Sequence, residues 1–169
     1  MFRLLSLYLC LFATSAIAAD LPPATKTFVD KVAVSNKFEI DTSGLALKYG
    51  KAALVNTFAR QMIDDHTKAG ADFKASLAQA NIAPPSDSLD VSHTAKYAQL
   101  RLFTTEKGFD HAYVQAQVEA HQDAVATFKD YAANGPTPAL KSFAERTLPT
   151  LEHHLDMAKS LQTKIPAED

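Results

Sequence analysis

The chain has 169 residues, of which 17 are Lys or Arg and 19 are Asp or Glu, so its formal net charge is -2. This balance leaves no basic surplus for binding nucleic acid or anionic lipid, and we expect no nucleic-acid partner. A chain of this length can bury a sizeable core in one domain.

The first 19 residues are typical of a secretory signal peptide. Arg3 supplies a positive charge, residues 4–12 are almost continuously apolar, and small residues at 16–19 offer a cleavage site. The apolar stretch is short of the about 20 residues that span a bilayer, which disfavours a retained anchor as the alternative. We therefore expect a periplasmic or other extracytoplasmic protein, with residues 20–169 as one domain that has no transmembrane span. Cleavage would remove the single cysteine, Cys10, and with it any disulfide or thiolate metal ligand.

Two long helices are predicted in the first half of the mature chain. One begins at Thr25 or Thr27 and ends near Tyr49, before Gly50; the next covers about residues 52–80. Residues at steps of three and four define the inward face of each helix. These inward positions are Phe28, Val32, Glu39 and Ala46 in the first helix, and Val55, Phe58, Met62, His66, Phe73 and Leu77 in the second.

Two more long helices are predicted in the second half. A loop at 81–88 precedes a short helix over about 92–105. Asp110 is expected to cap the third long helix, which ends near Ala133. A break at 134–138 then precedes the last helix, over about 138–164. The inward positions are Val114, Val118, His121, Val125 and Phe128, then Leu140, Ala144, Leu151, His154, Ala158 and Leu161. No window alternates with a period of two. The predicted fold is therefore all-α, a four-helix bundle with one short extra helix between the second and third long helices.

Each long helix carries, within its apolar stripe, one ionisable side chain of a kind that can bind a metal ion. In chain order these side chains are Glu39, His66, His121 and His154. Burying such a group without a partner costs several kcal/mol, so four of them suggest a common site. His121 and His154 lie at similar distances from the turn that joins their helices, and so do Glu39 and His66, within about one helical turn. The four residues are thus expected to form one layer, although two separate pairs would satisfy the same periodicity.

Three imidazoles and one carboxylate suit a single divalent transition metal as cofactor, with zinc, manganese and iron as candidates. Further residues near these positions could support the ligands by hydrogen bonds: Asp65, Asp110, Tyr113 and Gln117. Asp110 is first interpreted as the cap of its own helix, because it lies three turns from His121.

A metal-free alternative remains open, in which the same residues form a buried network that fixes the helix register of an envelope module with a structural or interaction role. A hydrolase or oxidase with an open metal position would need a solvent-accessible pocket beside the histidines, of which the sequence gives no sign. The sequence contains no nucleophile elbow and no glycine-rich phosphate loop, so it favours a protein without catalytic activity.

The order of these motifs resembles a known family. The matching segments are Phe28 with Glu39-Ile40, Met62-x-x-Asp65-His66, Gly108-Phe109-Asp110-x-x-Tyr113, Gln117-Val118-x-x-His121 and Leu148-Pro149-x-Leu151-x-x-His154. Together they resemble the exported bacterial family catalogued as domain of unknown function 4142, which is grouped with ferritin-like bundles and often labelled an outer-membrane protein. The resemblance covers about residues 27–161 and implies a ferritin-like, extracytoplasmic four-helix bundle. It implies motif positions at Glu39, Asp65, His66, Phe109, Asp110, Tyr113, His121 and His154.

Ferritin-like bundles suggest a di-iron centre, but the sequence does not predict one here. Di-iron bundles use Glu-x-x-His on two helices and a Glu from each of the other two. The residues three positions before the inward histidines are Ile63, Val118 and Leu151. The sequence therefore predicts one metal ion or none.

Overall fold

The computed structural model describes residues 21–105, 108–165 and 167. The predicted signal peptide, residues 1–19, lies outside the described residues, so cleavage and export stay predictions. Within the described part of the chain, no helix combines the length and the apolar character that crossing a membrane requires.

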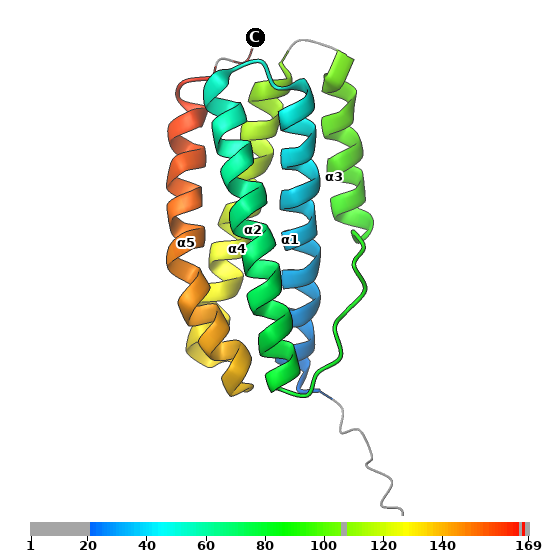
Figure 1. Cartoon of the computed structure of the whole chain (residues 1–169), viewed down its shortest axis with the longest axis vertical. Helices are drawn as coiled ribbons and strands as arrows, with labels where there is room; N and C mark the ends of the chain where they lie inside the picture. The colour runs from blue at the N-terminus through cyan, green and yellow to red at the C-terminus, as the bar shows by residue number, and fades with distance from the viewer. Residues whose placement is uncertain (1–20, 106–107, 166, 168–169) are drawn as a thin grey trace, which may run out of the picture.

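The described residues form an all-α bundle, as the sequence predicts. In chain order the elements are α1 (Pro23–Tyr49), α2 (Ala53–Gln79), α3 (Val91–Leu102), a 3-10 turn η1 (Phe103–Thr105), α4 (Phe109–Asn134) and α5 (Pro138–Gln162). The four long helices lie side by side, and α3 packs outside them against α1 and α4 (Figure 1). The short extra helix lies between the second and third long helices in the chain, where the sequence places it, with its last predicted turn wound as a 3-10 helix.

The chain turns between α1 and α2 at Gly50, which adopts extended backbone angles. Glycine is needed for space, because a Cβ on Gly50 would lie 2.5 Å from the carbonyl oxygen of Ala46. At the start of α4, by contrast, Gly108 takes the left-handed φ of 92° that favours glycine.

The sequence-based interpretation of Asp110 as the cap of its own helix is wrong. Gly108 occupies the N-cap position of α4, and Asp110 lies inside the first turn. Its buried carboxylate instead accepts hydrogen bonds from the backbone N–H groups of Lys51 and Ala52, the shortest at 2.7 Å. Asp110 thus satisfies backbone donors of the turn just before α2, a neighbour that periodicity within α4 does not reveal.

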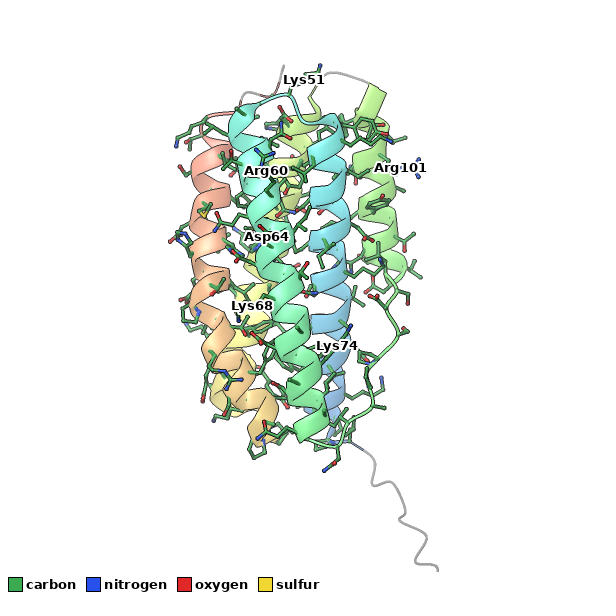
Figure 2. The ribbon with its side chains drawn as sticks, viewed as in Figure 1. Lys51, Arg60, Asp64, Lys68, Lys74 and Arg101 are labelled. Carbon is green, nitrogen blue, oxygen red and sulfur yellow. The ribbon has the colours of Figure 1, made fainter. Side chains whose placement is uncertain are left out.

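The core consists of two apolar clusters separated by a polar layer. One cluster includes Phe58, Met62 and Tyr113, and the other includes Phe28 and Phe128. The buried polar side chains between them include Glu39, Thr42, His66, Gln117, His121 and His154. On the outside, α2 presents charged residues along its length, among them Arg60, Asp64 and Lys68 (Figure 2). Each helix is therefore amphipathic, with its ionisable inward residue in the middle layer of the bundle.

Candidate metal centre

Three helices bring one histidine each to the middle of the bundle. The ring centroids of His66 on α2 and His121 on α4 are 5.7 Å apart, and His154 on α5 lies 5.6 Å from the first and 5.4 Å from the second. One ring nitrogen from each lies within 4.8 Å of the other two. The three side chains are at most 6% exposed. They form a nearly equilateral, buried triangle.

The size of this triangle suits a single metal ion. At metal–nitrogen distances of roughly 2.0–2.1 Å, tetrahedral geometry would hold imidazole centroids about 5.2 Å apart. The observed separations of 5.4 to 5.7 Å exceed this value by a few tenths of an ångström. Small side-chain rotations would close that difference.

Each histidine has one ring nitrogen engaged by an oxygen acceptor. The pairs are His66 Nδ1 with Asn36 Oδ1 at 3.1 Å, His121 Nδ1 with the Gln117 carbonyl oxygen at 3.0 Å, and His154 Nε2 with Asp65 Oδ2 at 2.9 Å. An N–H must occupy the engaged nitrogen to donate to such an acceptor, which fixes the tautomer of a neutral ring. The other nitrogen of each ring then carries a lone pair.

The remaining nitrogens are His66 Nε2, His121 Nε2 and His154 Nδ1. All three are buried, and none has a hydrogen-bond partner among the described residues. Lone pairs cannot satisfy one another, and a buried acceptor left unpaired costs about 1–3 kcal/mol. One cation between the rings would satisfy all three nitrogens together.

The electrostatic environment favours the neutral form of His66 and His154. Burial lowers the pKa of His66 well below 6.5, and the neighbouring His121 and His154 lower it further. Burial also lowers the pKa of His154, against the opposing effect of its hydrogen bond with Asp65. Metal binding requires an unprotonated nitrogen, so these shifts favour it at neutral pH.

Glu39 lies beside the triangle but outside the group of three ligand atoms. Its Oε1 atom is 3.8 Å from Nδ1 of His121, the nitrogen that donates to Gln117. Burial raises the pKa of Glu39 above its usual 4.5, while His121 and a hydrogen bond with Gln117 lower it. Its Oε2 atom is buried and has no partner within the described part of the chain. Direct ligation by Glu39 stays a prediction.

The sequence matches the family model described as a domain of unknown function, DUF4142, over residues 11–161. The protein belongs to the DUF4142 family. No curated protein and no solved structure matches the sequence significantly. The DUF4142 description names no activity, so the function has to be argued from the site itself.

Of the four supporting residues expected from the sequence, only Asp65 contacts a histidine of this DUF4142 domain with its side chain among the described residues, and its partner is His154 rather than its neighbour His66. Gln117 accepts from His121 through its backbone carbonyl oxygen, and its side chain donates to Thr42 instead. The other two do not reach the triangle. Tyr113 exchanges a 2.9 Å hydrogen bond with Ser43, and Asp110 caps α2 at the end of the bundle.

The sequence interpretation missed Asn36, whose side-chain oxygen accepts from His66. Asn36 lies three residues before Glu39, on the inward line that connects Val32 to Glu39. A side-chain amide at an inward helical position could have indicated a hydrogen-bond partner for the histidines. It supplies the third of the acceptors that orient the rings.

Proposed function

We propose that this protein binds one divalent transition metal ion, with zinc, manganese and iron as candidates, through His66, His121 and His154. Two observations carry the proposal: one ring nitrogen of each histidine lies within 4.8 Å of the other two, and each ring has one buried nitrogen without a hydrogen-bond partner among the described residues. In metal sites, histidine ligands usually donate their other ring N–H to a carboxylate or carbonyl oxygen. Asp65, Gln117 and Asn36 provide such acceptors here.

A metal-free buried network is the second candidate. The 2.9 Å contact between His154 and Asp65 and the 3.8 Å contact between His121 and Glu39 favour it, since both join a histidine to a carboxylate. A buried network stabilises a fold only when its members are satisfied. Five buried polar atoms in this layer lack partners among the described residues: Glu39 Oε2, His66 Nε2, Gln117 Oε1, His121 Nε2 and His154 Nδ1. The metal site explains three of these five, so it is the better-supported function.

We further propose that the protein holds this metal outside the cytoplasm, in metal handling or stress protection of the cell envelope. The support is the signal-peptide pattern of residues 1–19. The mass of the protein recovered from a periplasmic fraction tests this part. A chain that begins at Ala19 or Asp20 is expected, and an uncleaved chain in the cytoplasm would contradict it.

The decisive experiment is elemental analysis of the protein purified without chelator or histidine tag. The wild type should carry about one metal ion per chain, as a His-ligated single-ion site implies. The His121→Ala variant should lose it, because one of three ligands is gone. His153→Ala is the matched control, because His153 lies next to His154 but is exposed.

Two results would reject the metal site. One is a folded His121→Ala protein that retains the full metal content of the wild type. The other is a wild type that contains no metal and takes up none of the added zinc, manganese or iron. The metal-free candidate also predicts that a chelator leaves the melting temperature unchanged, whereas the metal site predicts that the chelator lowers it.

A further inference from the structure

A small cavity adjoins the histidine triangle. Its volume is about 30 Å³, and His66, His121 and Glu39 line it. A space that holds one water molecule needs at least about 10–15 Å³. The cavity is about two to three times this minimum, so it has room for a small ligand of a few atoms beside two of the three proposed ligands.

The donor set leaves a position for such a group. Within the described residues, the group of potential ligands consists of three histidines, whereas zinc takes four ligands. Structural zinc sites fill the fourth position with protein, and sites that act on small molecules leave it to solvent. Glu39 is 3% exposed, lines the cavity and carries an oxygen without a partner in the described chain, so a polar occupant has a hydrogen-bond acceptor there.

The cavity borders a larger groove of about 450 Å³ on the bundle surface, between α1, α3 and α4. The groove and the cavity share five lining residues: Val32, Ser35, Ala120, Ala124 and Phe128. Three of the five have small side chains, and Ala120 and Ala124 are one turn apart on the same face of α4. The three small residues are half-buried, and they lie beside the point where α3 begins and its cover of α1 ends (Figure 1).

We propose that the metal centre has an open fourth position, and that small monodentate ligands such as water or a short anion reach it through this groove. The inference rests on the proposed metal site. In such a site the fourth ligand of the metal ion exchanges with solvent, and the small side chains of Ala120 and Ala124 keep the route open.

A second groove of about 250 Å³ lies on the other side, between α2 and α5. It shares Ala69, Phe143 and Thr147 with the cavity. Each wall contains one buried phenylalanine ring, Phe143 here and Phe128 on the α1–α4 side. This wall has one alanine, Ala69, where the α1–α4 wall has Ala120 and Ala124. The larger α1–α4 groove is therefore the favoured route, and Ala69→Leu tests the alternative one.

The test uses the full-length exported protein loaded with cobalt(II), whose visible absorption reports the coordination of the ion, and azide as the probe ligand. In the wild type, azide should change the cobalt spectrum. The Ala124→Leu variant should retain its cobalt but respond to azide about tenfold more slowly, because entry then requires side chains to move. The Ala126→Leu variant, whose residue lines the groove but not the cavity, should respond at the wild-type rate. If Ala124→Leu fails to fold, Ala120→Leu at the same wall provides the same test.

The outcomes separate the two proposals. Cobalt binding without any azide response in the wild type would overturn the open position while leaving the metal site intact. Slowing by Ala69→Leu but not by Ala124→Leu or Ala120→Leu would overturn the α1–α4 route. A protein that binds no cobalt would reject the metal site itself, and the open position with it.

Discussion

Two buried polar regions of this bundle differ in how their hydrogen bonds are completed. At the end that carries Gly50, Asp110 accepts from the backbone of Lys51 and Ala52, and Tyr113 pairs with Ser43. In the middle layer, each histidine is paired on one ring nitrogen only. The second nitrogen of each ring is buried and has no partner in the described chain. Both regions are buried to a similar degree, so burial alone does not explain the contrast.

The difference indicates separate roles for the two regions. A polar group that serves the fold gains stability by completing its hydrogen bonds, as Asp110 does. Three buried ring nitrogens without partners among the described residues lower the stability of the metal-free fold, and such a cost is typical of a site that binds a ligand. The comparison therefore predicts that stability and metal affinity can be changed independently.

The largest effect on stability is expected from Asp110→Ala. The variant leaves the N–H groups of Lys51 and Ala52 without their acceptor, and loss of such a buried cap should lower the free energy of unfolding by about 2–4 kcal/mol. Urea unfolding of the metal-free protein measures this change. Zinc affinity of the folded variant should equal that of the wild type, because Asp110 does not reach the histidines.

Asp123→Ala is the control for this prediction, because Asp123 lies on the same helix and is exposed. It should leave the unfolding free energy within about 0.5 kcal/mol of the wild type. If Asp110→Ala also weakened zinc binding, the two regions would be coupled and the comparison would fail.

The opposite pattern is expected from Asp65→Ala. Asp65 orients His154 through Nε2, and loss of such a partner typically weakens metal binding about 10–100-fold. Stability of the metal-free protein should change by no more than about 1 kcal/mol, because the Asp65 side chain is 37% exposed and water can replace it.

Isothermal titration with zinc and urea unfolding together measure both quantities. Asp64→Ala is the matched control, since Asp64 is the adjacent carboxylate and lies on the outer surface of α2 (Figure 2). An unchanged zinc affinity in Asp65→Ala would show that the contact with His154 does not serve metal binding.

The fold was predictable because the periodic apolar positions and the Gly and Pro breaks agree along the chain. His121 and His154 also lie at similar distances from the turn between α4 and α5, so their heights were predictable to within about one helical turn. Lateral contacts were not predictable in this way. Asp65 pairs with His154, which is 89 residues away, and Asp110 reaches the start of α2. Periodicity tells which side of a helix a residue occupies, but the partner depends on which helix is packed there.

The same limit applies to Glu39. Its inward position follows from the spacing of α1, and the structure confirms that it is buried. Its position on the Nδ1 side of His121 depends on how α1 and α4 are rotated against each other, which the separate helices do not specify. The sequence thus predicted the layer, and the packing determined the order of the groups within it.

The smallest expected effect is a pH dependence of stability in the metal-free protein. The pKa values of His66 and His154 are lowered in the fold, so the unfolded chain binds protons first as the pH falls below about 6.5. Their contribution to stability is complete above that pH and declines on acidification. Glu39 acts in the opposite sense, because its raised pKa lets the folded state take up a proton above 4.5.

The free energy of unfolding should therefore decline from pH 7 toward pH 5.5, and Glu39→Gln should make the decline steeper by removing the opposing group. Urea unfolding in chelator at several pH values measures both slopes. A Glu39→Gln protein whose stability is constant or rises over this interval would contradict the lowered pKa values of His66 and His154, which favour the proposed metal binding.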